Sequence, residues 1–269
     1  MSELLKHPGH ERICEEMRSR YRTSAPELGF QVVRRRFGFY RRHIDHPESG
    51  LIIVDALTPD EVPEFVADAR NYFDNRALYI WLEDQDLEAE LASVLVTAGV
   101  SMGKATTYLA HVGPRPKRVH LADVTVEPVT AETLMDYVQV KLKGFANTEG
   151  EPSVEHVDQE LAVRGQELSS IGRFVIARLG AEPAAILGYY DGNDRLIFNL
   201  ATRTPFRMRG IARQLLRQVI ADSYDQGCRS VIINTDPTDT PIQWYQRLGF
   251  TDEVRWGRNY FFEPVLSRR

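Results

Sequence analysis

The fold is decided by one stretch of sequence, Leu200-Ala201-Thr202-Arg203-Thr204-Pro205-Phe206-Arg207-Met208-Arg209-Gly210-Ile211-Ala212. An apolar strand ends here, a turn follows, and a helix begins near Gly210. The first N–H groups of such a helix have no partner within it, and the helix dipole adds positive potential, so the turn is suited to hold a phosphate. Gly210 lets a ligand approach the backbone closely and small Ala212 leaves further room. Positive charge comes from Arg207, Arg209 and Arg213.

Strands and helices alternate on both sides of this stretch. Before it, the sequence predicts a strand over Val124–Pro128, a helix over Thr130–Phe145 and a second helix that ends near Ser169. Three strands follow, over Phe174–Leu179, Ala184–Tyr190 and Leu196–Ala201. After it we expect a helix to about Gln226, a strand over Ser230–Asn234, a helix to Leu248, and two short strands near Val254 and over Tyr260–Phe262. This interleaving predicts a mixed α/β fold, with a mixed sheet flanked by helices.

These residues resemble the acetyl-CoA signature of the GNAT N-acetyltransferase superfamily, (Q/R)-x-x-G-x-(G/A), which here reads Arg207-x-x-Gly210-x-Ala212. The later Tyr245-Gln246-Arg247-Leu248-Gly249-Phe250 is similar to the second signature of that superfamily, Y-x-x-x-G-F. Neither a nucleotide P-loop nor a dinucleotide fingerprint is present in the stretch. The resemblance covers about residues 120–265 and implies the acyl-CoA N-acyltransferase fold in the C-terminal half.

The resemblance also implies how acetyl-CoA, as co-substrate, is bound. Two parallel strands would splay apart to admit the pantetheine arm, which would pair with the backbone of Leu200, Ala201 and Thr202. The pyrophosphate would be held by the N–H groups of Arg207, Met208, Arg209, Gly210, Ile211 and Ala212, with Arg213 nearby. The acceptor amine attacks the thioester directly, and Tyr245 matches the tyrosine that protonates the departing thiolate. The alternative for Tyr245 is a packed aromatic beside Trp244 and Phe250.

The general base stays unassigned. Many members of the superfamily carry a glutamate on the strand before the phosphate turn, whereas Arg195-Leu196-Ile197-Phe198-Asn199-Leu200 has no carboxylate. An asparagine that often precedes the tyrosine by seven residues is replaced by Thr238. Asp236 and Glu155 are the candidates for the base. The loop from Phe145 to Glu155 and the surface between the two predicted domains are expected to shape the acceptor pocket.

In the first half, the strand–helix–strand–helix–strand order from Leu51 to Val112 parallels that from Leu196 to Phe262. This half starts with a polar helix over Glu11–Arg22 and extended segments at Phe30–Val33 and Phe37–Tyr40. Strands at Leu51–Val54, Ala77–Leu82 and Thr106–Val112 then enclose helices at Pro59–Phe73 and Leu87–Ala98. Where a phosphate turn would lie, the chain has Ala56-Leu57-Thr58-Pro59-Asp60-Glu61, without glycine and with two acids. We therefore predict two domains, residues 1–117 as a degenerate GNAT-like domain without cofactor and residues 118–269 as the acetyltransferase, joined near Gly113–Lys117.

Composition excludes several other classes of protein. The chain has 269 residues with 43% hydrophobic and 26% charged residues, which is typical of a folded globular protein. The net charge of −5 does not favour nucleic acid, and two distant cysteines, Cys14 and Cys228, favour neither a disulfide framework nor a zinc module. The sequence shows no signal-peptide core and no spanning helix, so we expect a cytoplasmic protein without membrane contact.

Three further patterns favour other functions only weakly. The basic and aromatic run Arg34–Arg42 is typical of a nucleic-acid surface, but arginine is abundant throughout the chain and alternation leaves such charges on a solvated face. His43, Asp45 and His46 lack a third metal ligand of suitable spacing, so no metal site is expected. No Gly-x-Ser-x-Gly elbow supports hydrolase chemistry.

The sequence predicts a transferase that acetylates a primary amine on a small molecule or peptide, and it leaves a homodimer open. The alternative function is a non-catalytic acetyl-CoA sensor or regulatory module. Antibiotic, polyamine, amino acid, protein N-terminus and small thiol precursor all remain open as acceptors.

Overall fold

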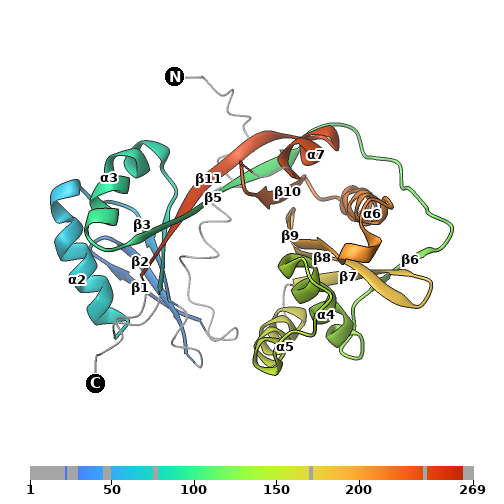
Figure 1. Ribbon diagram of the computed structural model, residues 1–269. Coiled ribbons are helices and arrows are strands. Elements are labelled where there is room, and N and C mark those ends of the chain that lie inside the picture. The colour runs from blue at the N-terminus through green and yellow to red at the C-terminus, as the bar shows by residue number, and fades with distance from the viewer. Residues whose placement is uncertain are drawn as a thin grey trace. The chain divides into compact units, whose positions relative to one another are not determined.

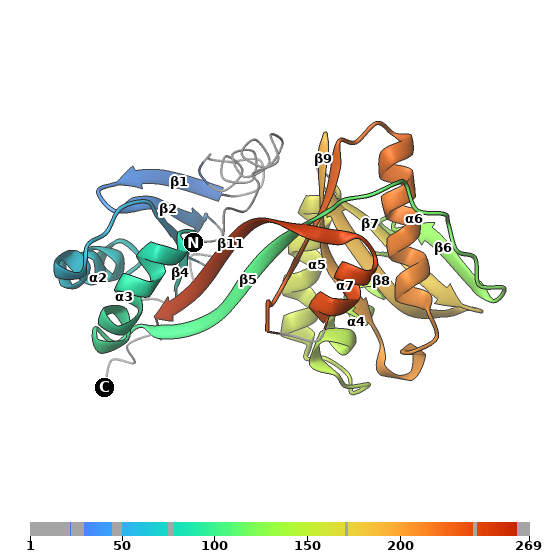
Figure 2. The same ribbon diagram turned by 90° about the horizontal axis from the view of Figure 1, so that it is seen from above.

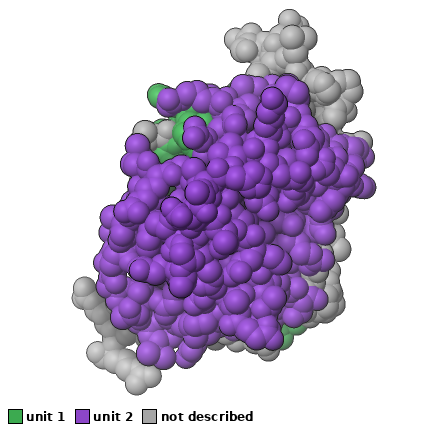
Figure 3. Space-filling model, turned by 90° about the vertical axis from the view of Figure 1, so that its right-hand side faces the viewer, with its two compact units in different colours: residues 1–109, 235–244, 253–269 green, residues 110–234, 245–252 purple. Residues whose placement is uncertain are grey.

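The computed structural model describes Arg22 and residues 30–44, 50–74, 78–169, 172–238 and 241–262. The chain divides into two compact units, residues 1–109, 235–244 and 253–269 in unit 1 and residues 110–234 and 245–252 in unit 2 (Figure 3). These units interleave along the chain, whereas the predicted boundary after residue 117 divides it once, and that boundary stays a prediction. The predicted helix over Glu11–Arg22 lies outside the described residues apart from Arg22.

Unit 1 holds a mixed sheet with helices on one face (Figure 1). Its elements in chain order are β1 (Phe30–Arg35), β2 (Gly38–His43), β3 (Gly50–Val54), η2 (Pro59–Glu61), α2 (Val62–Tyr72), β4 (Leu78–Leu82), α3 (Gln85–Thr97) and β5 (Ser101–His111). The strand order β1-β2-β3-β4-β11 combines antiparallel pairs with the parallel pair β3 and β4. The predicted strand and helix order of this half is confirmed.

One register row explains the core of unit 1. Tyr40, Ile52, Ile80 and Tyr260 lie side by side across four strands and are all fully buried. Because alternate residues of a strand point to opposite faces, this row turns toward α2 and α3. It packs there in one cluster with residues of both helices, among them Phe65 and Leu91.

The last strand corrects one expectation. The sequence predicts two short strands near Val254 and over Tyr260–Phe262, but β11 is one strand of 13 residues, Phe250–Phe262. Its C-terminal part pairs antiparallel with β4, from Arg258 opposite Leu82 to Phe262 opposite Leu78. Gly257 does not mark a turn: a Cβ there would lie 2.0 Å from the Trp81 ring, so this glycine makes room for the indole in an unbroken strand.

Unit 2 holds the sheet that carries the predicted site. Its elements in chain order are β6 (Val124–Pro128), α4 (Leu134–Ala146), α5 (Val154–Leu168), β7 (Gly172–Leu179), β8 (Glu182–Tyr190), β9 (Asp194–Thr202), η3 (Thr204–Phe206), α6 (Ile211–Asp225) and β10 (Ser230–Thr235). Helix α7 (Pro241–Arg247) is divided between the two units and belongs to unit 2 from Tyr245 onward. The strand order is β10-β9-β8-β7-β6, and only β9 and β10 run parallel. Helices α4 and α5 cover one face of this sheet and α6 the other (Figure 2).

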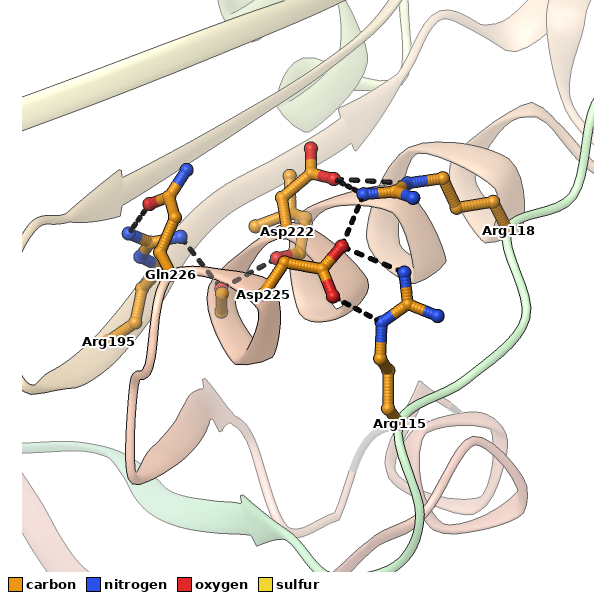
Figure 4. A network of polar contacts seen from close by, with 8 residues as sticks. Arg115, Arg118, Arg195, Asp222, Asp225 and Gln226 are labelled. Carbon is orange, nitrogen blue, oxygen red and sulfur yellow. Dashed lines mark hydrogen bonds and ion pairs between the residues drawn. The ribbon is translucent and has the colours of Figure 1, made fainter.

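The predicted linker Gly113–Lys117 is held against α6. Arg115 donates two hydrogen bonds to Asp225, at 2.6 and 2.8 Å, and Arg118 contacts both Asp222 and Asp225 (Figure 4). Farther along the chain, the N–H of Leu121 donates to the side chain of Gln214 at 2.9 Å. This segment therefore follows the whole length of α6 within unit 2.

Candidate active site

The parallel pairing of strands β9 and β10 ends before β9 does. Their parallel register runs from Asp194 opposite Ser230 to Ile197 opposite Ile233. Strand β9 then continues to Thr202 beyond this register. Its backbone from Phe198 onward is therefore not engaged with β10, and an extended ligand can pair with it there.

A β-bulge lies at the point of separation. On the other side of β9, the antiparallel register with β8 shifts between Ile186, which faces Ala201, and Gly188, which faces Phe198. Asn199 has a φ of 53°, in the left-handed region. A bulge disrupts the regular ladder and redirects backbone groups, so β9 changes direction before it reaches Leu200.

The turn after β9 has the conformation that an anion site requires. Arg207 is extended, Met208 has a φ of 61°, and Gly210 has φ and ψ of 79° and 2° at the N-cap of α6. Glycine adopts this left-handed conformation without strain, and it has no side chain to cover the first N–H groups of the helix. The predicted residues Arg207 to Arg213 thus form one continuous strand-to-helix turn with Ile211 as the first residue of α6.

The three arginines of the turn have different surroundings. The Arg207 guanidinium donates to the carbonyl of Thr202 at 3.0 Å and to the carbonyl of Gly144, in the last turn of α4, at 2.8 Å. Arg209 and Arg213 are exposed beside the start of α6. Arg207 therefore holds the turn in place through its side chain, and all three arginines are exposed residues.

The loop between α4 and α5 is tied to the same region. Arg203 pairs with Glu149 of this loop at 2.5 Å and donates to the carbonyl of Pro183 at 3.0 Å. Lys143 pairs with Glu151 at 2.6 Å. Sequence reasoning missed Gly144, where an added Cβ would lie 3.1 Å from the Cβ of Ala201. The close approach of α4 to the end of β9 needs this glycine.

Tyr245 lies in the last turn of α7, within unit 2. Its side chain is 8% exposed. Its ring packs edge-on against Phe250 with centroids 6.2 Å apart. Packing and catalysis, the two roles weighed for this residue, are therefore compatible, because a ring fixed by its neighbours can direct one hydroxyl.

The candidate bases differ in environment. Hydrogen bonds from the hydroxyl and the backbone N–H of Thr238, at 2.6 and 2.8 Å, hold the pKa of Asp236 below its usual range. Lys104 lies 3.3 Å from the same carboxylate. A carboxylate stabilised in this way is a weak base. Glu155 is exposed in the first turn of α5, where the positive end of the helix dipole stabilises its negative charge. Its role as a base stays a prediction.

A cluster of charged side chains between α4 and α5 is already paired. Glu160 contacts Lys141 and accepts from Arg164 at 3.1 Å. Burial alone would raise the pKa of Glu160, but these two cations outweigh it and lower the pKa. Tyr190 donates to Glu167 at 2.8 Å, and Arg164 also contacts that carboxylate. Glu160 thus ties α5 to α4 through Lys141, and Glu167 ties α5 to β8 through Tyr190, so both carboxylates are already engaged and are poor candidates for the missing base.

The remaining sequence candidates lie in unit 1, at Cys228 of unit 2, or outside the described residues. In the Arg34–Arg42 run, Arg35 pairs with Asp68 at 2.5 Å and Arg36 pairs with Glu61 at 2.7 Å, so acidic neighbours offset much of this charge. Asp45 and His46 lie outside the described residues, as does Cys14. Burial raises the pKa of the Cys228 thiol, which disfavours a nucleophilic thiolate. Within the described ranges there is neither a cluster of metal-ligating side chains nor a helix that could cross a membrane.

Both the sequence and the fold of this chain are similar to those of known proteins. Residues 170–252 match the family model of the acetyltransferase (GNAT) domain. The fold is similar to that of a GCN5-related N-acetyltransferase from Kribbella flavida, with 18% identity, a TM-score of 0.61 and 96% of each chain covered. A conserved protein of unknown function from Staphylococcus epidermidis matches with 12% identity and a TM-score of 0.68 over 88% of this chain and 96% of that one.

A tandem arrangement is found among the similar folds. The tandem GNAT protein from the clavulanic acid biosynthesis pathway matches with 12% identity and a TM-score of 0.60, over 86% of this chain and 80% of that one. Residues 170–252, which contain both signatures, thus match the GNAT domain that the signatures predict, within the mixed α/β fold expected of the chain. The domain points to acyl transfer as the chemistry.

Proposed function

We propose that this chain is an N-acetyltransferase that transfers an acetyl group from acetyl-CoA to a primary amine. The observation that carries the proposal is the separation of β9 from β10 after Ile197, followed by the left-handed turn at Gly210. The extended pantetheine arm of acetyl-CoA needs free strand backbone, and its pyrophosphate needs a helix N-terminus. The end of β9 and the Gly210 turn offer these in that order along the chain. The GNAT match over residues 170–252 supports the same reading.

The residues present fit acetyl-CoA. The backbone of Leu200, Ala201 and Thr202 continues beyond the register with β10, so its polar groups can pair with the amides of a pantetheine arm. The first N–H groups of α6 and the exposed Arg209 and Arg213 can hold the pyrophosphate. When bound, acetyl-CoA supplies a thioester carbonyl carbon that is open to attack by an amine.

Tyr245 is proposed to donate a proton to the departing CoA thiolate. The amine nitrogen bonds to the carbonyl carbon, the C–S bond breaks, and the thiolate takes the phenol proton of Tyr245. A phenol with a pKa of about 10 can protonate a thiolate whose conjugate acid has a pKa of about 8.5 when the two groups are placed close together. The proton lost by the amine passes to a base that is not yet assigned.

The acceptor class is a primary amine on a small molecule or peptide. The loop over residues 147–153 is a reasonable wall of its pocket, because Arg203 and Glu149 tie that loop to the end of β9. We propose this loop as the determinant of acceptor choice. Exchanging Glu149 for Gln frees the loop without changing the cofactor turn, and it should alter the KM for the amine more than that for acetyl-CoA.

The test is the release of free CoA thiol from acetyl-CoA in the presence of amines. A panel of an aminoglycoside, spermidine, single amino acids and a short peptide with a free N-terminus covers the acceptor classes. Amine-dependent thiol release, with the acetylated amine identified by mass spectrometry, supports the enzyme. Tight acetyl-CoA binding without turnover across the whole panel would instead support a sensor, and no acetyl-CoA binding would reject both.

A further inference from the structure

Four aromatic rings of unit 2 form a continuous column that ends at Tyr245. Tyr224 of α6 lies 5.7 Å from His111 of β5, between ring centroids. His111 lies 5.4 Å from Phe250, edge-on at 76°, and Phe250 lies 6.2 Å from Tyr245 with the same interplanar angle. The column connects Tyr224, near the C-terminal end of α6, to Tyr245 of α7. Figure 1 labels the two helices.

His111 is the only member of this column that also bonds at both sides of its ring. Its Nδ1 lies 3.0 Å from the Tyr224 hydroxyl, and a hydrogen bond with the backbone of Leu248 opposes the lowering of its pKa by burial. The Tyr224 hydroxyl also donates to the backbone carbonyl of His111 at 3.4 Å. The side chain is 7% exposed, so both bonds are made away from water.

The Leu248 backbone that His111 contacts belongs to the turn that ends α7. In this turn the N–H of Leu248 donates to the carbonyl of Tyr245 at 2.9 Å, and Gly249 donates to Gln246 at 3.0 Å. Gly249 has a φ of 100°, and a Cβ there would lie 2.8 Å from Nε2 of His111. On the strand side, the N–H of Val112 donates to the carbonyl of Gly249 at 2.7 Å. The turn is thus fixed from one side by the ring and backbone at residues 111 and 112.

We propose that His111 is a positioning residue for Tyr245: it fixes the Leu248–Gly249 turn and, through Phe250, the ring of Tyr245. This inference rests on the proposed function, in which Tyr245 protonates the thiolate. A phenylalanine at this position would fill the same space, yet it would remove the ring nitrogens that face the Leu248 backbone and the Tyr224 hydroxyl. The hydroxyl would keep only its 3.4 Å bond to the backbone carbonyl of residue 111. The two hydrogen bonds, rather than the ring alone, are what the position requires.

The first experiment measures position directly, without turnover. Amide hydrogen exchange at Val112, Leu248 and Gly249 is followed by NMR in the wild type, in His111→Phe and in His111→Gln. Loss of the bond to Leu248 should speed exchange at these three amides by about ten-fold in His111→Phe. Glutamine can hydrogen-bond to the same backbone, so His111→Gln should restore most of the protection. Unchanged exchange in His111→Phe would overturn the proposal, and so would equal loss in both variants.

The second experiment asks whether the positioning reaches the chemistry. We expect His111→Phe to lower kcat by about ten-fold while the KM for acetyl-CoA changes less than about two-fold, since β9 and the phosphate turn are not touched. In a Tyr245→Phe background the same change should lower kcat by less than about two-fold, because its route to the reaction is already removed. An equal loss in both backgrounds would overturn the proposal.

Failure of the proposed function is distinguishable from failure of this inference. If the wild type releases no thiol with any amine, the function fails, and the exchange measurement still decides whether His111 fixes the turn. If His111→Phe does not fold, Tyr224→Phe takes its place. That variant removes one partner of His111, should raise exchange at Gly249 by about three-fold, and overturns the proposal if protection is unchanged.

Discussion

Two strand-turn-helix segments, β3 to α2 in unit 1 and β9 to α6 in unit 2, have the same element order, and each has a parallel neighbouring strand. They differ in how much of the strand is paired with that neighbour. Strand β3 pairs with β4 from Gly50 to Ile53, which is nearly its whole length, whereas β9 pairs with β10 only up to Ile197. One strand is fully used inside its sheet. The other has a second half that remains available to a ligand.

The turns differ in the same sense. In unit 1 the carboxylate of Glu61 accepts from the N–H and the hydroxyl of Thr58, at 3.0 and 2.9 Å, and completes a capping box. Two acids lie in the first turn there. In unit 2 the N-cap is Gly210, and the nearby charges are arginines. A protein carboxylate thus occupies one turn, while the other has both the space and the charge for a phosphate.

The contrast extends to the next helix of each segment, α3 and α7. A glycine follows each of these helices, and the residue four positions before it is Leu95 for Gly99 and Tyr245 for Gly249. Both glycines have positive φ, and both N–H groups donate to the residue three positions earlier, at 3.0 Å. Leu95 is fully buried in the apolar core of unit 1. The same local frame therefore presents an aliphatic side chain in one unit and a phenol in the other.

The largest expected effect tests that phenol. Tyr245→Phe removes the proposed proton donor and should lower kcat by about a hundred-fold, since a positioned general acid contributes about that much or more. The affinity for acetyl-CoA should be unchanged, because the β9 backbone and the phosphate turn are intact. Steady-state kinetics and calorimetry separate the two quantities. Tyr79→Phe, at an exposed tyrosine of unit 1, is the matched control and should have full activity. Full activity in Tyr245→Phe would remove this residue from the mechanism.

The next effect tests the charge of the second turn. Arg209→Glu places a carboxylate beside the first N–H groups of α6 and should weaken acetyl-CoA binding by about ten-fold at low salt. Arg217→Glu makes the same charge reversal farther along α6 and should change the affinity by less than about three-fold, because the terminal field falls off within the first turn. Titration calorimetry at two salt concentrations measures both. Equal effects would show that net charge, not the turn, governs binding.

Local sequence predicted the turn, but not what holds it. The glycine and small residue of the first signature, with an apolar strand before and an amphipathic helix after, were enough to place β9, Gly210 and α6. The side chain of Arg207 was expected near phosphate, yet it bonds to the carbonyls of Thr202 and Gly144, and the latter lies 63 positions away in sequence. Such a partner is chosen by packing, so no window along the chain reveals it.

The end of the chain shows the same limit. Short apolar segments near Val254 and Tyr260 predict two strands, whereas one strand runs through both and pairs with β4. What makes this continuous is the Trp81 ring lying on Gly257, a contact between distant parts of the sequence. Glycine reads locally as an interruption, although here it permits close packing.

A third prediction concerns the closed turn of unit 1. Thr58→Ala removes the hydroxyl of the capping box and should lower the free energy of unfolding by about 1 kcal/mol, measured by urea denaturation. Neither this variant nor Glu61→Gln should change the stoichiometry of acetyl-CoA binding, which we expect to be one molecule per chain. Two molecules per chain, in the wild type or after opening this turn, would break the comparison between the units.

The smallest effect tests whether the buried histidine makes one turn more sensitive to pH than the other. Burial lowers the pKa of His111 from 6.5, and the hydrogen bond to Leu248 only partly opposes this. As the pH falls below 6.5, the unfolded segment takes up a proton before the folded one, so the stability contributed by the neutral imidazole is lost as the pH decreases through the lowered pKa.

The corresponding turn in unit 1 closes with Val100 donating to Leu95, inside an apolar cluster. Hydrogen exchange between pH 5 and pH 8, corrected for the intrinsic rate, should therefore show opening of Gly249 becoming easier toward about pH 5 while that of Val100 stays constant. His111→Gln should remove the slope at Gly249, and a slope that persists in this variant would assign the pH dependence to another group.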